Sequence, residues 1–130
     1  MISPTGNNTI RMDSLGSGKY GARRKNRYHK GVDYECLPGE YVFAPISGNI
    51  SREAIPYANK EYSGCVIVGK LQTIKMFYFK FDKSLIGKQV AQGDIIGTAQ
   101  DISKLHGSEM KPHIHVEIIS IDPDLFINQL

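Results

Sequence analysis

The segment Lys111–Glu117 constrains the fold more than any other stretch, because polar and apolar residues alternate in it after Pro112. Single apolar residues separate His113, His115 and Glu117. Successive side chains of a β-strand point to opposite faces, so these three polar side chains would share one face. Two imidazoles two positions apart lie about 6.6–6.8 Å apart along a strand, which lets them converge on one small centre. The segment therefore predicts a strand with a histidine-bearing face.

The rest of the chain has the pattern of short strands separated by turns. Its thirteen glycines and few long apolar periodic runs favour strands and tight turns over helices. We predict an all-β, antiparallel, β-sandwich-like fold with short or no helices. Residues 1–130 are expected to form a single domain, with residues 1–19 as an irregular lead-in. Strands are expected near Thr9–Met12, within His29–Cys36, at Tyr41–Pro45, Asn49–Glu53, Cys65–Gly69 and Thr73–Phe79, within Val90–Gly97, and at residues 112–119.

Helical structure is expected at two places only. The loop Asp101–Met110 has room for one helical turn. A helix is predicted to begin at Asp122, because aspartate is favoured at the N-cap and Pro123 then occupies the first helical position.

The chain is mildly basic, with a formal net charge of +3, and part of that charge lies in residues 20–28. We interpret this segment as a solvated loop, and the alternative is a loop that meets a polyanion. Nucleic acid is not an expected partner, because no helix-turn-helix, ribonucleoprotein or zinc-finger pattern accompanies the charge.

Neither cysteine, Cys36 or Cys65, belongs to a metal-binding spacing such as CxxC. The simpler interpretation is that both are isolated, buried thiols. The alternative is a disulfide between them, if the chain lies in an oxidising compartment. The first residues lack the apolar region of a secretory signal, and no apolar run is long enough for a membrane span.

A second polar cluster, His29-x-x-x-Asp33, can meet the histidine-bearing strand only if the chain bends. In a straight strand the two side chains would lie about 13 Å apart, too far to share one metal ion. Gly31 between them allows a bend, so we expect His29 at a loop end and Asp33 inside a strand. Each cluster alone is a weak signal, but together they use three of the four histidines and predict a metal site.

A resemblance to a known family supports this prediction. Five blocks, in order and with the family's spacing, resemble the M23 (LytM/lysostaphin-type) zinc endopeptidases across about residues 14–120. The blocks are Ser17–Arg23, His29–Asp33, Val42–Gly48, Gln92–Gly97 and His113–Glu117.

The resemblance implies an M23/LytM-type fold, one zinc ion per chain and cleavage of the peptide cross-bridges of bacterial peptidoglycan. By position, His29, Asp33 and His115 would be the zinc ligands, and His113 would be the catalytic general base. Glu117 shares the face of both histidines, where it would orient an imidazole or lie exposed.

The sequence departs from the family at one catalytic position. Active M23 enzymes carry a second catalytic histidine in a Tyr-x-His-Leu-type block, and here we align that position with Phe79. His106, Tyr78 and Lys80 are candidates for an accessory role in its place, although each also fits an ordinary surface or strand position. The expected peptidase is therefore one whose activity is impaired by this replacement.

A second resemblance implies an alternative function. Residues 55–60, Lys75–Tyr78 and Asp122-Pro123 are similar to LECT2-type M23-fold proteins, a branch regarded as zinc-binding signalling proteins without peptidase activity. The alternative is thus a non-catalytic zinc-binding recognition or structural module, whose partner is a wall peptide, another peptide ligand or a larger assembly. A peptidoglycan enzyme without a signal peptide would need delivery by a phage or a secretion apparatus, or removal of a leader.

Overall fold

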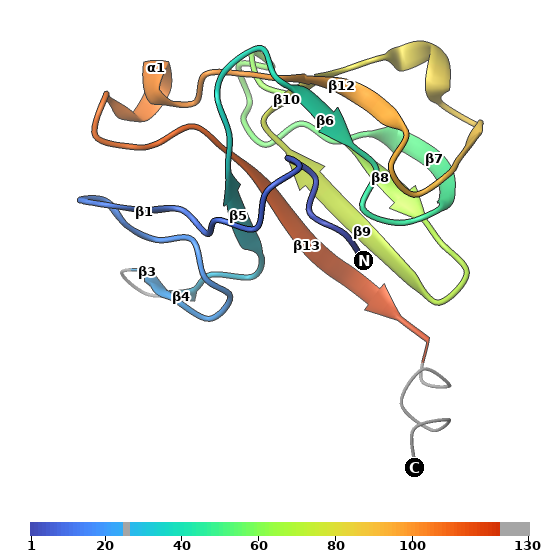
Figure 1. Cartoon of the computed structure of the whole chain (residues 1–130), viewed down its shortest axis with the longest axis horizontal. Helices are drawn as coiled ribbons and strands as arrows, with labels where there is room; N and C mark the ends of the chain where they lie inside the picture. The colour runs from blue at the N-terminus through green and yellow to red at the C-terminus, as the bar shows by residue number, and fades with distance from the viewer. Residues whose placement is uncertain (25–26, 123–130) are drawn as a thin grey trace.

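The computed structural model describes residues 1–24 and 27–122, which form antiparallel β-sheets with one short α-helix (Figure 1). The predicted all-β class is therefore confirmed. Six strands make the larger sheet, and each is antiparallel to its neighbours. In spatial order they are β11 (Gln89–Val90), β7 (Gly48–Glu53), β8 (Gly64–Val68), β9 (Gln72–Phe77), β13 (His113–Ile121) and β5 (Val32–Glu35).

A smaller sheet packs against one face of the larger one. Its antiparallel strands, in spatial order, are β10 (Phe79–Phe81), β12 (Ile95–Ala99) and β6 (Tyr41–Phe43). Apolar side chains from both sheets form one buried cluster, which includes Val42, Ile67, Ile96 and Ile114. The apolar face of β13 therefore serves the core, and the opposite face of that strand is left for its histidines.

Residues 1–9 contain no strand, as expected of an irregular lead-in, but residues 12–17 are a regular part of the fold. They form the hairpin of β1 (Met12–Asp13) and β2 (Gly16–Ser17). The same segment covers the free edge of β5, because the backbone of Asp33 accepts from the Arg11 amide at 2.8 Å and donates to Gly18 at 2.8 Å. Covering an edge strand satisfies its unpaired backbone groups and protects it from association. The expected strand near Thr9–Met12 is reduced to an isolated bridge between Ile10 and Tyr34, followed by β1.

The basic segment also forms a hairpin, of β3 (Arg23–Arg24) and β4 (Arg27–Tyr28), with residues 25–26 outside the description. In the described part of the chain, helical structure is limited to the 3-10 turn η1 (Lys83–Leu85) and to α1 (Ser103–His106), the turn expected in the loop before β13. The helix predicted to begin at Asp122 falls on residues 123–130, which lie outside the described residues. Among the described residues no helix has the length and hydropathy that a membrane crossing requires.

The predicted hairpin strand Thr73–Phe79 ends two residues early. Tyr78 has a φ of +81°, a left-handed conformation that is uncommon for a residue with a side chain. The chain turns there from β9 in the large sheet into β10 in the small one. This break decides which aromatic side chains face the histidines and which face the core.

Cys36 and Cys65 are both buried and both carry free thiols. Burial raises the pKa of each thiol to about 12. At pH 8 only about one thiol in ten thousand would be the reactive thiolate.

This environment predicts that neither cysteine of the native chain reacts with iodoacetamide at pH 8 within minutes. Both should react at once in guanidinium chloride, because unfolding restores an ordinary thiol pKa and exposure. Mass spectrometry counts the added groups. Rapid labelling of the fully buried Cys65 in the native chain would contradict the packing described here.

Candidate metal centre

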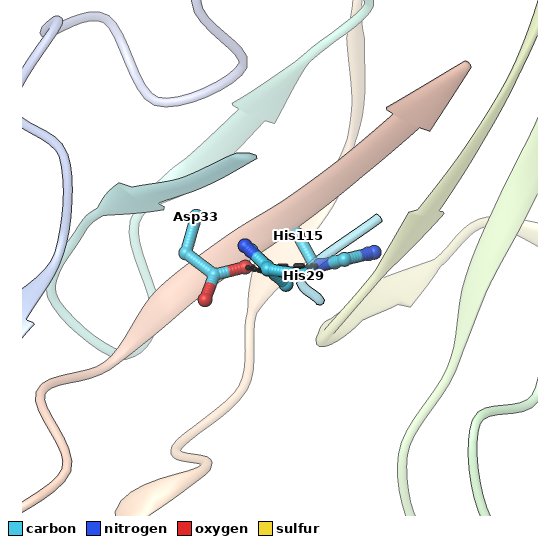
Figure 2. Close-up of side chains that lie close together, drawn as sticks. All are labelled: His29, Asp33 and His115. Atoms are coloured by element: carbon cyan, nitrogen blue, oxygen red, sulfur yellow. Dashed lines mark hydrogen bonds and ion pairs between the residues drawn. The ribbon is translucent and has the colours of Figure 1, made fainter. Parts of the chain in front are cut away.

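His29, Asp33 and His115 bring three potential ligand atoms together at the open face of β13 (Figure 2). His29 Nε2 lies 3.2 Å from His115 Nδ1 and 3.2 Å from Asp33 Oδ1, and these last two atoms are 2.9 Å apart. Ligands held about 2.0–2.1 Å from a tetrahedral metal ion lie about 3.3 Å from one another. The three atoms therefore form a triangle of nearly the size that such an ion requires.

Two neighbouring strands of the larger sheet, β13 and the edge strand β5, bring these residues together. His115 of β13 is paired directly with Asp33 of β5, so their side chains project from neighbouring positions of the same sheet face. His29 follows β4 and reaches the same point from a loop, as the bend between the two cluster residues requires.

Hydrogen bonds behind each histidine aim a lone pair at the shared centre. His29 Nδ1 lies 3.0 Å from the Lys19 carbonyl oxygen, which can only accept, so this nitrogen carries the proton and Nε2 is free in the neutral ring. His115 Nε2 lies 3.0 Å from Glu117 Oε1 and donates to it, which leaves Nδ1 for the centre. Glu117 is therefore an orienting group of the kind that metal-binding histidines normally have.

Arg11, which sequence reasoning missed, holds the other oxygen of Asp33. Its side chain is only 2% exposed, and its Nε donates to Asp33 Oδ2 at 3.2 Å. Its Nη1 donates to both carboxylate oxygens of Asp13 at 2.9 Å. Because Oδ2 is engaged by the guanidinium, Oδ1 is the oxygen of Asp33 that is presented to the centre.

The charges at the centre favour a bound cation or proton. Burial alone would raise the pKa of Asp33, but hydrogen bonds from His115 and His29 outweigh it and hold that pKa far below its usual value. Burial would lower the pKa of His115, yet its hydrogen bond to Asp33 raises it overall. A metal ion and protons thus compete for the same atoms, and metal binding would release a proton.

Gly31 is required by a close approach and not by the free bend we expected. Its φ is not in the left-handed region, but an added Cβ would lie 2.7 Å from His115 Cε1 and 2.5 Å from the Val116 carbonyl oxygen. The absence of a side chain lets the His115 ring lie against the backbone.

The predicted base, His113, lies beside the three ligand atoms. Its side chain is buried, its Nδ1 donates to the Lys111 carbonyl oxygen at 2.8 Å, and its Nε2 is 3.6 Å from Asp33 Oδ2. Burial lowers the pKa of His113, although the Asp33 charge acts in the opposite direction. The ring is therefore neutral at pH 7, with an unprotonated nitrogen beside the centre.

Tyr78, and not Phe79, occupies the position facing His113. Phe79 is fully buried in the core, so our alignment of the missing histidine with Phe79 was wrong. The left-handed backbone at Tyr78 turns its ring toward the site, where it packs edge-on against His113 with ring centroids 5.2 Å apart. Burial raises the pKa of Tyr78, which keeps its hydroxyl protonated.

A cleft of about 340 Å³ opens over these groups. Phe77 lines it and stacks on the His115 ring with centroids 5.6 Å apart, while the expected accessory residue His106 lines it from the end of α1. The predicted accessory candidate Lys80 is exposed on β10, and the cleft lining does not include it. The cleft is lined by Arg11, His29, Lys30, Asp33, Pro56, Tyr57, Phe77, Tyr78, His106, Met110, His113, His115 and Glu117.

Glu117 accepts a hydrogen bond from His115, and we expect this acceptor oxygen to support metal binding more than the charge of the carboxylate does. Glu117→Leu should weaken zinc binding about 10- to 100-fold, because His115 loses the group that fixes its tautomer. Glu117→Gln keeps an acceptor oxygen and should stay close to the wild-type affinity. Competition with a chromogenic chelator measures both. Equal zinc affinity in the leucine variant and the wild type would refute this role.

Comparison with known proteins agrees with the geometry. The sequence profile of Peptidase family M23 matches residues 27–124, a span that holds the three ligand candidates, His113 and Tyr78. Leukocyte cell-derived chemotaxin-2 of Mus musculus is 34% identical over 128 residues, which cover 96% of this chain and 83% of the mouse protein.

Two solved structures share the fold at lower identity. The catalytic domain of the prophage-encoded M23 protein EnpA from Enterococcus faecalis superposes with a TM-score of 0.59 at 18% identity, covering 94% of this chain and 95% of that domain. The antimicrobial peptidase lysostaphin from Staphylococcus simulans gives a TM-score of 0.59 at 22% identity. Here the match covers 92% of this chain but half of the lysostaphin chain. On the family match and the near full-length relative, this chain belongs to peptidase family M23.

Proposed function

We propose that this chain is a zinc-dependent endopeptidase of the M23 type that hydrolyses peptide cross-bridges of bacterial peptidoglycan. The observation that carries the proposal is the spacing of His29 Nε2, Asp33 Oδ1 and His115 Nδ1, whose mutual distances of 2.9–3.2 Å suit a tetrahedral ion. Two nitrogens and one carboxylate oxygen are a donor set that zinc accepts, and three protein ligands leave a fourth position open for chemistry. A structural zinc site would normally close with four.

Each neighbouring residue has a role that its contacts support. Zinc, when bound, supplies a Lewis acid and lowers the pKa of a water molecule toward 7. His113 accepts the proton of the attacking water at Nε2, because its Nδ1 is committed to the Lys111 carbonyl oxygen. Arg11 keeps Asp33 in place and balances its charge through the contact with Oδ2.

Tyr78 supplies the donor that the family's second histidine would otherwise provide. Its ring faces His113, and its raised pKa keeps the hydroxyl proton available. A neutral phenol can donate to the oxyanion that forms when water attacks a peptide carbonyl. Removing one such donor typically lowers the rate about 10²–10³-fold. The strength of the hydrogen bond that Tyr78 donates therefore determines how far the activity is impaired.

Peptidoglycan is proposed as the substrate class on fold-level analogy with two M23 structures. The names of these proteins describe lysostaphin as an antimicrobial peptidase and EnpA as prophage-encoded. Action on the cell wall would place the protein outside the cytoplasmic membrane, and delivery by a phage or a secretion apparatus fits that role. The same cleft would also accept a peptide of another origin.

A second candidate is a zinc-binding module that recognises a peptide without cutting it. Two observations favour it: the ring that faces His113 belongs to Tyr78 and not to a histidine, and chemotaxin-2 proteins match nearly the whole chain. In this alternative the three ligands and the cleft bind a peptide end or a partner protein, and His113 is a neutral neighbour of the metal.

Purified sacculi distinguish the two candidates. The zinc-loaded chain should release new amino groups from them, whereas His113→Ala should retain zinc and lose at least about 10²-fold in rate, as expected for a general base. Released amines are counted with fluorodinitrobenzene. Release by the wild type no greater than by His113→Ala would exclude the peptidase and leave the recognition module.

Replacing the tyrosine by the family residue gives a second test. Tyr78→His should raise the rate of amine release, because a protonated imidazole donates to an oxyanion more strongly than a phenol does. Phe79→His is the matched control at the neighbouring position, and it should destabilise the fold by placing a polar ring in the core. A Tyr78→His rate below that of the wild type would contradict the role given to this position.

A further inference from the structure

Tyr78 keeps an uncommon backbone conformation that several neighbours hold in place. At a φ of +81°, a residue with a side chain is strained, and the conformation persists only where the surrounding structure imposes it. Its amide donates to the Ser63 carbonyl oxygen at 2.7 Å, and its own carbonyl accepts from the Gln100 amide at 2.9 Å. The effect of this conformation is that Phe77 and Tyr78, adjacent in sequence, both line the cleft, which a regular strand does not allow.

A short chain of hydrogen bonds leads from the Tyr78 hydroxyl to the protein surface. The hydroxyl oxygen lies 3.1 Å from that of Tyr57, in the loop between β7 and β8. The Tyr57 hydroxyl in turn lies 3.0 Å from His106 Nε2, at the end of α1. Three segments that are distant in sequence therefore meet along one wall of the cleft.

Two arrangements are possible when the Tyr57 hydroxyl donates within this chain of hydrogen bonds. Each tyrosine has one hydroxyl proton. If Tyr57 donates to an unprotonated His106 Nε2, the Tyr78 proton must point to Tyr57, away from the cleft. If His106 carries the proton on Nε2 and donates to Tyr57, then Tyr57 donates to Tyr78, and the Tyr78 proton is free to point into the cleft.

We propose that Tyr57 and His106 are positioning residues that turn the Tyr78 hydroxyl into a donor toward an oxyanion held at the metal centre. This inference rests on the metal centre of the proposed function. It does not require turnover, because any tetrahedral oxyanion bound at the metal would receive the same hydrogen bond. Tyr57 then acts only through Tyr78, and His106 only through Tyr57.

Tyr62 provides a matched control within the same aromatic cluster. Its ring packs edge-on against both Tyr57 and Tyr78, with centroids 6.1 and 6.2 Å apart. Its hydroxyl, however, donates to the Asp101 carbonyl oxygen at 2.9 Å and is not part of the hydrogen-bond chain. Removing this hydroxyl tests for general loosening of the cluster.

The test measures binding of inorganic phosphate, a tetrahedral oxyanion, to the zinc-loaded full chain by titration calorimetry. Tyr78→Phe should weaken phosphate binding about 10-fold or more, as expected for a hydrogen bond to a charged group, and Tyr57→Phe about threefold. Tyr62→Phe should leave the affinity unchanged. The double variant Tyr57→Phe/Tyr78→Phe should bind no more weakly than Tyr78→Phe alone, since Tyr57 acts through Tyr78.

His106 supplies the final discriminating result. His106→Leu should reproduce the loss seen in Tyr57→Phe, and His106→Gln should restore binding, because its amide can donate to Tyr57. Additive losses in the double variant, wild-type affinity in Tyr57→Phe, or no phosphate binding by the zinc-loaded wild type would each overturn the inference.

The outcome is separable from that of the proposed function. If the chain cleaves sacculi but Tyr57→Phe leaves the phosphate affinity unchanged, only the positioning role is overturned. The predicted phosphate losses without any cleavage support the positioning role and exclude the peptidase.

Discussion

The structure around the candidate centre depends on one contact, the pairing of His115 with Asp33 across β13 and β5. Taking a carboxylate out of water is costly unless it is paired and hydrogen-bonded, and Asp33 is only 3% exposed. Its partners come from three directions: His115 along the sheet, His29 from a loop, and Arg11 from the segment that covers the edge of β5. Arg11 offsets the buried charge, so the carboxylate can remain ionised and present one oxygen to a cation.

The sequence predicted those parts of the site that depend on local periodicity. Alternation in the β13 segment placed His113, His115 and Glu117 on one face, and the cleft is lined by all three. The sequence could not reveal Arg11, because a single arginine 22 positions before Asp33 has no pattern that links the two. Its contact depends on how the N-terminal segment lies along the edge of β5, which only tertiary structure determines.

The error at Phe79 has a similar origin. The segment Thr73–Phe79 was predicted as one strand, but the left-handed conformation of Tyr78 ends β9, and Phe79 lies in the core. The sequence Phe77-Tyr78-Phe79 gives no sign of a positive φ, because this conformation is expected mainly at glycine or asparagine. Tyr57 lies in a loop, where the sequence pattern does not predict which way a side chain points. The clustering of His29, Asp33 and His115 was thus predictable, while the contacts made by Arg11 and Tyr57 were not.

The central claim is that His29, Asp33 and His115 hold one zinc ion and that His113 does not. Metal analysis of the purified chain and of four single alanine variants tests it most directly. The account predicts one zinc per chain in the wild type and in His113→Ala, and loss of the metal in His29→Ala, Asp33→Ala and His115→Ala. A wild-type chain that binds no zinc, or an Asp33→Ala variant that keeps it, would contradict the account.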